Sequence, residues 1–462
     1  MSDKKIDAVE NGLLTANFVK GLEQQSGSLD DRLERYRVPG VSVSVINDSM
    51  IAWSKGYGVR EAGMDSRVTT DTLFQAASIS KPVTALAVLD LVEQGKLDLD
   101  EEVNQWLSSW KIPENEYTQK SKVTLRRILS HTAGITVHGF PGYSSGEVVP
   151  TLLQILKGEH PANTEPIQVD IEPGSTTRYS GGGYIVVQQL IEDVTGRPFQ
   201  EFMQNTILEK LAMHDSFFEQ PFAHSHQNRP ATAHNATGSP IAGKWHTYPE
   251  KAAAGLWTTP TDLARFLIEI MQSSKGLSNK LLSVGIINEM LTPQNEIFGL
   301  GLELKKGAGE ICRFSHSGSN QGFRCYMVAY RETGQGAVVM TNGDNGDLLI
   351  KEILRGIAHA YGWADFHPQE RTIAQIDSDT LTGFEGNYHL VDWPEFVIQV
   401  TVDNSRLVAE NIPASLRFDL YPESKNKYFA FELELTIEFI PDDDGDINTL
   451  MLGPNMKMEK TK

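Results

Sequence analysis

A helix without a polar face is predicted from Pro82 to Glu93. Most of its circumference is apolar, and Gly95 follows where such a helix would end. The apolar residues are Val83, Ala85, Leu86, Ala87, Val88, Leu89, Leu91 and Val92. A helix that is apolar on all sides has to be enclosed by other elements of the same protein. The sequence therefore predicts a central buried helix inside a sizeable domain.

Length and composition indicate a folded globular protein, and the charge indicates which partners it does not bind. The 462 residues are enough for two or three domains, and 40% hydrophobic with 22% charged residues is typical of a folded globular chain. Because 41 Lys and Arg face 60 Asp and Glu, the formal net charge is −19. Such a surface repels phosphate backbones and anionic lipid, so we expect neither a nucleic-acid partner nor a membrane partner.

Targeting signals and cysteines give expectations about location. The opening residues lead into no apolar run typical of a signal peptide, and no stretch reaches the ~18 apolar residues of a membrane span, so a cytoplasmic protein is expected. Two cysteines, Cys312 and Cys325, are too few for a disulfide framework, and we expect two free thiols.

Periodicity divides the chain into regions. The first 25 or so residues are polar and unpatterned and are expected to be loosely docked. Alternation in 41–46, a polar break, and 51–53 predict a β-hairpin, while 183–195 and 261–272 have helical patterns. A polar, Pro-interrupted stretch near 365–380 is typical of a linker. We therefore expect an extension at 1–27, a main domain at 28–362, a linker at 363–380 and a C-terminal domain at 381–462.

The C-terminal region changes to a period of two. In 429–439 every odd position is large and apolar, which predicts one strand with a buried and a solvent-exposed face. Residues 442–445 supply a turn before the apolar 450–452, and 396–400 is a further strand candidate. The last 85 or so residues are thus expected to form an all-β sheet or small barrel.

Ser78 and Lys81 are the first candidate catalytic pair. Residues three apart lie on one face of a helix, so the lysine amine can reach the serine hydroxyl and act as its base if burial lowers the lysine pKa. The spacing alone is weak evidence, because it recurs at Ser2/Lys5, Ser108/Lys111 and Ser424/Lys427. The alternative is that Ser78 only caps the buried helix.

Two further motifs follow in a recognisable order. Tyr179-Ser180-Gly181 begins a helical pattern, and His316-Ser317-Gly318-Ser319 ends a strand-like stretch. With Ser78-Ile79-Ser80-Lys81, and with the stretches 123–135 and 254–264, residues 28–362 resemble the serine β-lactamase and penicillin-binding superfamily. The resemblance is to its class C-like branch, which includes family VIII esterases, D-aminopeptidases and DD-peptidases.

The resemblance implies a role for each motif. Ser78 would be the acylated nucleophile, Lys81 its proton acceptor, and Tyr179 a phenol held among cations that relays the proton to the leaving group. His316 would steer the substrate or steady Tyr179. The backbone N–H groups of Ser78 and Ser319, with Gly318 beside the latter, would form the oxyanion hole.

Gly181 is a departure from the family pattern. Relatives usually have Asn at this substrate-binding position, where it contacts the substrate's amide side chain and the catalytic lysine. Its absence weakens the case for an efficient β-lactamase and favours ester or small-amide hydrolysis, unless a neighbouring side chain fills the gap.

Several of these residues, and other histidines, also have purely structural interpretations. Taken alone, Tyr179 and His316 would be packed core or surface residues, and only their order in the chain favours a site. We interpret His131 as a hydrogen-bonded turn residue without a catalytic part. His224, His226 and His234 lack a Cys or carboxylate at ligand spacing, so no metal site and no cofactor are expected, and we place them in a loop near the cleft.

The sequence thus predicts an α/β (α+β) protein: an antiparallel sheet flanked by helices, an all-helical lobe, and a C-terminal β-barrel that the resemblance implies to be lipocalin-like. Such a barrel would cap the cleft or mediate assembly into a homo-oligomer. The expected function is a serine hydrolase acting on a small ester, amide or β-lactam. The alternatives are a penicillin-binding or sensor module that is acylated without turnover, and a non-catalytic homologue.

Overall fold

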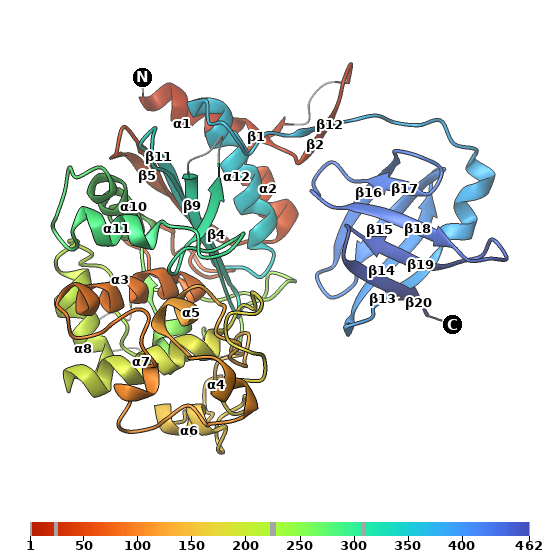
Figure 1. The fold of residues 1–462 in the computed structure, drawn as a ribbon. Helices are drawn as coiled ribbons and strands as arrows, with labels where there is room; N and C mark the ends of the chain where they lie inside the picture. Colours follow the sequence, from red (N-terminus) through yellow and green to blue (C-terminus); the bar gives the residue numbers. More distant parts are fainter. Residues whose placement is uncertain (1, 23–25, 222–227, 307–310, 462) are drawn as a thin grey trace. The chain divides into compact units, whose positions relative to one another are not determined.

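The structure is a computed structural model that describes residues 2–22, 26–221, 228–306 and 311–461 (Figure 1). It divides into two compact units. The sheet unit comprises residues 39–235 and 239–346, and the barrel unit comprises 1–38, 236–238 and 347–462. α2 and α12 therefore group with the barrel, whereas the sequence prediction placed both in the 28–362 domain.

The elements have the following bounds. The α-helices are α1 Ser2–Asn11, α2 Leu29–Tyr36, α3 Ser80–Glu93, α4 Glu116–Lys120, α5 Leu125–Leu129, α6 Leu152–Lys157, α7 Gly181–Thr195, α8 Phe199–Met203, α9 Lys251–Ala254, α10 Pro260–Ser274, α11 Val284–Met290 and α12 Gly346–Tyr361. Shorter helical turns are η1 Ala77–Ile79, η2 Val103–Gln105, η3 Gln204–Leu208 and η5 Ser378–Phe384. The sheet unit's strands are β4 Gly40–Asn47, β5 Met50–Gly58, β6 Phe74–Gln75, β7 Trp257–Thr258, β8 Glu303–Lys306, β9 Ile311–Asn320, β10 Phe323–Tyr330 and β11 Gln335–Thr341. The barrel unit's strands are β1 Leu13–Leu14, β2 Asn17–Val19, β3 Ser26–Gly27, β12 Gln369–Arg371, β13 Gly386–Leu390, β14 Trp393–Asp403, β15 Arg406–Asn411, β16 Leu416–Pro422, β17 Lys427–Phe429, β18 Thr436–Pro441, β19 Ile447–Leu452 and β20 Met456–Lys460.

The sheet unit is built on an antiparallel sheet. Within the described residues its six strands follow the order β5-β4-β11-β10-β9-β8. The predicted hairpin is confirmed as β4 and β5, with Val45 opposite Trp53. Helix α10 packs along β4, β5, β10 and β11, and its apolar side chains are buried there.

The predicted central helix is confirmed as α3. Its residues from Ser80 to Leu91 are all buried, and Gly95 takes the positive φ of +68° that ends the helix. The predicted helical patterns at 183–195 and 261–272 correspond to α7 and α10. Helices α5, α6, α8 and α9 all contact α7 and form the helical lobe together with it (Figure 1).

The C-terminal barrel is closed. Strands β13 to β20 pair in sequence, and β13 also pairs with β20, so the barrel has no free edge (Figure 1). Its interior is packed with aromatic rings: Phe384 stacks on Phe439 with ring centres 4.4 Å apart, while Tyr388 and Tyr428 meet Phe439 edge-on. The prediction of a small C-terminal barrel is confirmed.

The prediction of one continuous strand from 429 to 439 is wrong. Strand β17 ends at Phe429, β18 begins at Thr436, and a loop at 430–435 lies between them. The side-chain amide of Asn17 donates to the carbonyls of Ala430 (2.7 Å) and Leu433 (2.6 Å), and the Asn17 N–H donates to Phe431 O (2.9 Å). These bonds engage loop carbonyls that a strand would have paired with its neighbours.

Charged residues hold the same loop. Glu432 pairs with Arg35 of α2, and Glu434 pairs with Lys351 and Arg355 of α12. Glu432 and Glu434, at even positions of the alternating stretch, are therefore ion-pair partners of helices within the barrel unit.

The expectation of a loosely docked N-terminus is also wrong. Residues 2–11 form α1, and Leu13 and Leu14 are buried in β1. Strand β2 pairs in parallel with β12 through Asn17 and Gln369. The start of the described chain is thus an integral part of the barrel unit.

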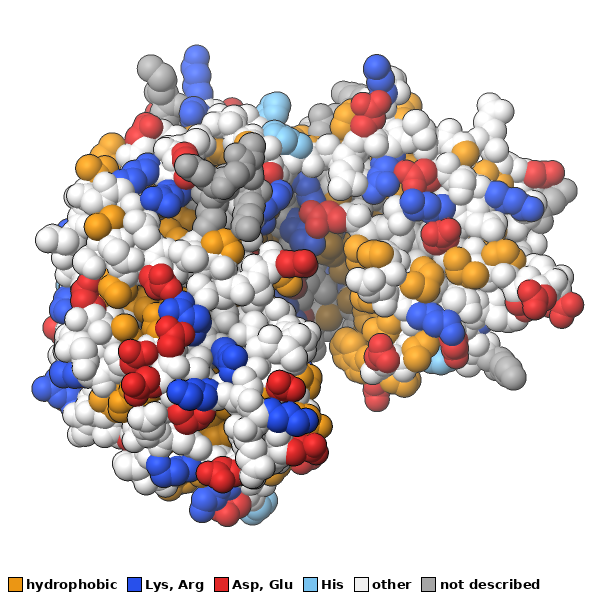
Figure 2. Space-filling view, in the orientation of Figure 1, with side chains coloured by type: hydrophobic (Ala, Val, Ile, Leu, Met, Phe, Trp, Pro, Cys, Tyr) orange, Lys and Arg blue, Asp and Glu red, His pale blue; other side chains and the backbone are white. Residues whose placement is uncertain are grey.

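Acidic and basic side chains are interspersed over the visible face, and hydrophobic side chains gather on part of the barrel (Figure 2). In the described part of the chain, no helix is both long and apolar enough to span a bilayer.

Candidate active site

Ser78 lies in a tight turn between β6 and α3. Ala77 before it has a φ of +50°, a left-handed conformation that is costly for a residue with a Cβ. Hydrogen bonds hold this turn: the Ser80 hydroxyl donates to Ala77 O (2.6 Å) and accepts from the Leu256 N–H (3.0 Å). The N-cap position of α3 is Ile79, so Ser78 is not the cap of that helix. The strained turn leaves the Ser78 side chain partly exposed.

Lys81 lies next to Ser78 on the first turn of α3. Its Nζ is 2.9 Å from Ser78 Oγ and 2.9 Å from the carbonyl oxygen of Ala253 in α9, and the residue is only 2% exposed. Burial lowers the pKa of Lys81 to about 7. A substantial fraction of the amine is therefore neutral at neutral pH and can accept the Ser78 proton.

Tyr179 lies one residue before Ser180, the N-cap of α7, and its ring faces the Lys81 amine. The Lys81 Nζ lies 4.9 Å from the centre of the phenol ring. Burial and the negative charge of Glu303 raise the pKa of Tyr179, against the opposing effect of a hydrogen bond with the Ser78 side chain. Tyr179 is therefore a protonated phenol in contact with the serine.

His316 lies on β9, with its ring centre 6.4 Å from that of Tyr179. Its Nδ1 is 2.6 Å from Ser317 O; since a carbonyl only accepts, Nδ1 carries the proton. The Nε2 atom is buried and has no hydrogen-bond partner among the described residues. Burial, with a smaller effect of the Lys81 charge, lowers the pKa of His316 to about 3.

These pKa shifts correct the expectation of a phenol held among cations. Burial disfavours the charged form of both His316 and Lys81, so the imidazole is neutral and the amine is close to half-protonated at pH 7. The surroundings of Tyr179 keep it protonated rather than ionised.

Gly318 brings β9 against the turn that carries Ser78. A Cβ at this position would lie 2.2 Å from Ala76 O and 2.4 Å from Cys325 Sγ. Glycine is therefore required for this close approach. Ser319, the next residue, is exposed and pairs with Arg324 of β10.

Gly181 has no side chain to offer a substrate. It is buried as the first residue of α7, and its N–H donates to His138 O (3.0 Å). A Cβ there would lie 2.9 Å from the Phe140 ring. The Phe140 ring therefore lies where a side chain at this position would begin.

Two histidines lie beside the ring of Tyr179. The ring centre of His131 is 4.2 Å from that of Tyr179, and the ring centre of His138 is 4.9 Å from it. His131 accepts a hydrogen bond from Ser180 and has a φ of +59°, in agreement with a hydrogen-bonded turn residue. His138 belongs to no motif, and nothing in the sequence marked it.

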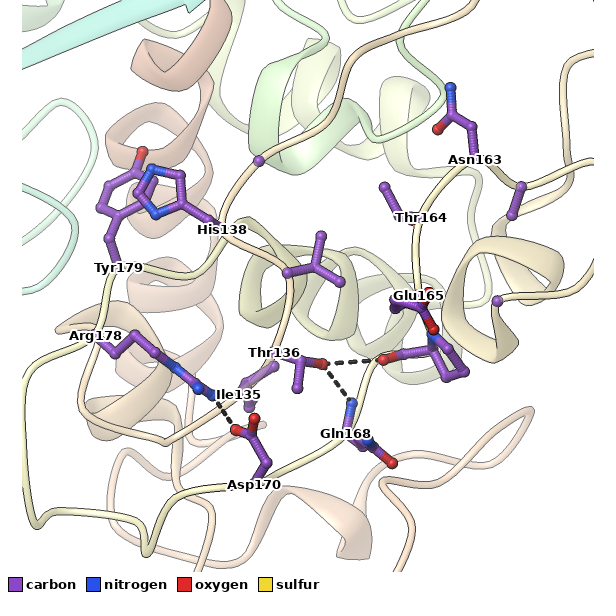
Figure 3. Close-up of a pocket in the computed structure, with 15 residues that line it drawn as sticks. Ile135, Thr136, His138, Asn163, Thr164, Glu165, Gln168, Asp170, Arg178 and Tyr179 are labelled. Atoms are coloured by element: carbon purple, nitrogen blue, oxygen red, sulfur yellow. Dashed lines mark hydrogen bonds and ion pairs between the residues drawn. The ribbon is translucent and has the colours of Figure 1, made fainter. Parts of the chain in front are cut away.

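A cavity of about 1010 Å³ adjoins Tyr179. Tyr179 and His138 form one end, and Asn163, Thr164 and Glu165 line the other (Figure 3). All its lining residues belong to the sheet unit.

The other predicted groups are accounted for as follows. His234 is buried, with Nδ1 2.8 Å from Asn342 O, and its Nε2 accepts from the Ala62 N–H, so it is a structural residue rather than part of a loop over the cleft. Residues His224 and His226 lie outside the described residues, as does the side chain of Cys312. Cys325 is buried, and its Sγ lies 3.1 Å from Ala76 O. Within the described ranges, no group of three His, Cys, Asp or Glu side chains is arranged to hold a metal ion.

Known proteins resemble the chain over most of its length. The family model "Beta-lactamase" matches residues 25–360. Penicillin-binding protein 4* of Bacillus subtilis (strain 168) is 24% identical over 423 residues, which are 85% of this chain and 88% of that protein. Among solved structures, the octameric penicillin-binding protein homologue from Pyrococcus abyssi has a TM-score of 0.62 and 23% identity, with 94% and 98% of the two chains covered. The D-amino acid amidase from Ochrobactrum anthropi SV3 has a TM-score of 0.57 and 22% identity, with 78% and 99% covered.

Proposed function

The chain belongs to the beta-lactamase family, and from that premise we propose that it is a serine hydrolase that forms an acyl-enzyme on Ser78 and hydrolyses small esters or amides. The observation that carries this proposal is the 2.9 Å contact between the Ser78 hydroxyl and a buried lysine whose pKa is lowered to about 7. This arrangement joins a nucleophile to a base that functions at neutral pH.

Acylation begins with transfer of the Ser78 proton to neutral Lys81. As Oγ bonds to the substrate carbonyl carbon, the C=O electron pair moves onto oxygen, where the N–H groups of Ser78 and Ser319 stabilise it. When the tetrahedral intermediate collapses, the bond to the leaving atom breaks. Tyr179 donates its proton to that atom and is reprotonated by the Lys81 ammonium. The leaving group departs as an alcohol or amine, and Lys81 is neutral again.

Deacylation repeats these steps with water. Water gives a proton through Tyr179 to Lys81 and attacks the acyl carbon, and Ser78 Oγ leaves and recovers the proton from Lys81. The neutral His316 offers an unprotonated Nε2 beside Tyr179, which suits it to accept a hydrogen bond from water or substrate.

Within this activity we place the protein with carboxylesterases or D-amino-acid peptidases, with weak β-lactam hydrolysis. The support is the glycine at position 181, where the Phe140 ring occupies the space of an amide side chain. The fold similarity to a D-amino acid amidase is compatible with this class.

A second candidate is a penicillin-binding module that is acylated but not turned over, a function supported by the similarity to penicillin-binding protein 4*. Incubation with a short-chain p-nitrophenyl ester, and separately with a fluorescent penicillin, distinguishes the candidates. Steady ester turnover supports the hydrolase. A stoichiometric penicillin label without turnover supports the binding module. If neither turnover nor labelling is seen, the protein is the non-catalytic homologue.

The nucleophile is tested with a matched pair of variants. Ser78→Ala should abolish turnover and labelling. Ser108→Ala is the control, because Ser108 is exposed and precedes Lys111 with the same spacing. Activity that survives in Ser78→Ala would remove Ser78 from its role.

A further inference from the structure

We propose that Asn320 is a positioning residue for the oxyanion hole: its side-chain amide fixes the end of β9, and with it the N–H of Ser319, relative to the turn that carries Ser78. This inference rests on the proposed function and adds to it a residue that acts through the backbone. Asn320 is the last residue of β9, directly after Ser319, and is only 5% exposed.

The Asn320 amide joins β9 to two other parts of the candidate site. Its Nδ2 donates to Gln75 Oε1 (2.8 Å) and to the carbonyl oxygen of Ala254 (3.2 Å). Gln75 lies in β6, which leads into the turn of the nucleophile. Ala254 ends α9 and directly follows Ala253, whose carbonyl accepts from Lys81 Nζ (2.9 Å). One amide thus contacts the supports of both the nucleophile and the base.

Backbone carbonyls at both ends fix the direction of these hydrogen bonds. A carbonyl only accepts, so the contact with Ala254 O identifies the Asn320 atom as the amide nitrogen. Gln75 Nε2 donates to His246 O (2.8 Å), which leaves Gln75 Oε1 as the acceptor for Asn320. Both bonds of the Asn320 amide are buried, so its loss would leave two buried acceptors without that donor.

The end of β9 has a strand neighbour on one side only. β8 pairs with β9 as far as Ser315, so the edge of 316–320 that faces away from β10 is not covered by β8. At Gly318 the strand meets the turn of the nucleophile, since a Cβ there would lie 2.2 Å from Ala76 O. Pairing with β10 holds β9 in the sheet but does not by itself fix its distance from that turn. The Asn320 amide supplies a direct link, next to the N–H group that the proposed mechanism uses.

Removing the amide should weaken the oxyanion hole without removing a reacting group. In Asn320→Leu the Ser319 N–H remains but is less well placed. The expected loss is therefore smaller than the about 10²–10³ that follows removal of a hole donor, and we expect kcat/KM for a p-nitrophenyl ester to fall about tenfold.

The decisive readout compares this ester with its thionoester, in which sulfur replaces the carbonyl oxygen. Sulfur is larger and a weaker hydrogen-bond acceptor, so the thionoester gains less from the hole. Each kcat/KM is divided by the rate constant for hydroxide-catalysed hydrolysis of the same compound, which removes its intrinsic reactivity. In Asn320→Leu the oxygen-to-sulfur ratio should fall about fivefold, because mainly the oxygen ester loses stabilisation. An equal fall for both compounds, or an unchanged ratio, would overturn the proposal.

Asn342→Leu is the matched control. Asn342 is a fully buried asparagine whose Nδ2 also donates to two backbone carbonyls, those of Arg60 (2.9 Å) and Val59 (3.3 Å). These residues lie beyond the end of β5 and have no part in the proposed mechanism. We expect Asn342→Leu to lower the midpoint of urea denaturation as Asn320→Leu does, with the oxygen-to-sulfur ratio unchanged. A ratio that falls equally in both variants would reflect general destabilisation and contradict the proposal.

Asn320→Ser provides a milder change in case the leucine variant does not fold. Its hydroxyl ends one bond short of the amide nitrogen, so it cannot keep both hydrogen bonds. The same fall in the oxygen-to-sulfur ratio is expected, and a folded Asn320→Ser protein with the wild-type ratio would overturn the proposal.

A binding measurement separates this inference from the proposed function. Phenylboronic acid adds to Ser78 Oγ, whose proton passes to Lys81, and the tetrahedral adduct places a boron hydroxyl where the oxyanion would lie. Tryptophan fluorescence measures its affinity without turnover, with Ser78→Ala as the background. Asn320→Leu should weaken this binding severalfold, and Asn342→Leu should not.

The two failures have different signatures. Ser78-dependent ester turnover without any effect of Asn320→Leu on the oxygen-to-sulfur ratio defeats this inference alone. Absence of Ser78-dependent turnover defeats the proposed function, while the boronate affinities still decide the role of Asn320. Absence of both turnover and Ser78-dependent boronate binding would overturn both.

Discussion

The imidazole of His131 lies against the phenol of Tyr179, with ring centres 4.2 Å apart and planes tilted by 31°. Its Nδ1 accepts a hydrogen bond (3.1 Å) from the N–H of Ser180, the N-cap residue of α7. One buried histidine thus positions the proposed proton donor and also satisfies the backbone at the start of the helix that follows.

Two substitutions separate these contributions. His131→Phe keeps a ring beside Tyr179 but removes the acceptor of the Ser180 N–H, and we expect it to lower the free energy of unfolding by about 1–3 kcal/mol. His131→Asn offers an acceptor and tolerates the left-handed backbone, but it lacks the ring, so kcat should fall more than stability. Urea denaturation and ester kinetics on both variants provide the measurements. Full activity in His131→Asn would show that the ring contact is dispensable.

The lowered pKa of Lys81 predicts the pH profile. The neutral amine is the active base, so kcat/KM should fall about tenfold per pH unit below a pKa of about 7 and level off above it. His316, with a pKa of about 3, does not titrate in this range. Rates from pH 5 to 9 on a p-nitrophenyl ester test this. Lys81→Arg, which stays protonated, should be inactive, and a flat profile would exclude Lys81 as the base.

The packing of Gly181 predicts that the residue usual in relatives is not tolerated here. Gly181→Asn should lower the free energy of unfolding by about 1–3 kcal/mol, because its Cβ would lie 2.9 Å from the Phe140 ring. The loss should be partly recovered in a Phe140→Ala background. Gly139→Ala is the control, since a Cβ at that position would meet no atom within 4 Å. Thermal unfolding of Gly181→Asn, Phe140→Ala, the double variant and Gly139→Ala measures these stability changes. Equal stability of Gly181→Asn and Gly139→Ala would contradict the prediction.

Close approach at Gly318 predicts a catalytic defect. In Gly318→Ala the new methyl group meets the backbone oxygen of Ala76, so β9 has to move away from the turn that presents Ser78. If the Ser319 N–H belongs to the oxyanion hole, kcat should fall by about 10²–10³. Ester kinetics, with circular dichroism as a check on folding, provide the measurement. Unchanged kcat would be incompatible with this placement.

The burial of the Glu250 carboxyl group predicts a loss of stability as the pH rises. It is fully buried, its carboxyl oxygens have no hydrogen-bond partner among the described residues, and burial raises its pKa to about 8. Since the folded pKa exceeds the usual value of 4.5, the folded state retains a proton that the unfolded state loses between pH 4.5 and 8. Stability is therefore lost as pH rises through this window. Glu250→Gln should flatten this part of the profile, as measured by denaturation at pH 5, 7 and 9.

Local patterns were sufficient for the main elements. The hairpin of β4 and β5 and the helix α3 follow from periodicity within a dozen residues. The shared site of Ser78, Tyr179 and His316 was expected from the resemblance of their motifs to those of a known family. Those three side chains and Lys81 do lie together in the sheet unit.

Long-range partners account for most of the failures. The break at 430–435 depends on Asn17 and Arg355, which lie far away in the sequence and whose pairing no local pattern encodes. His138 meets Tyr179 only through the fold. The neutral state of His316 likewise depends on complete burial, because motif residues do not reveal their solvation.

The barrel unit joins the two ends of the described chain: β2 pairs with β12, and Asn17 holds the loop between β17 and β18. On a translating ribosome, residues 1–38 therefore emerge long before their partners are synthesised. The sheet unit, contiguous from 39 to 346 apart from 236–238, can fold during that interval, whereas the N-terminal segment has to wait for the barrel strands. Leu13 and Leu14 are buried in the complete barrel unit, and we expect them to stay accessible to water and to chaperones until its later strands have been made.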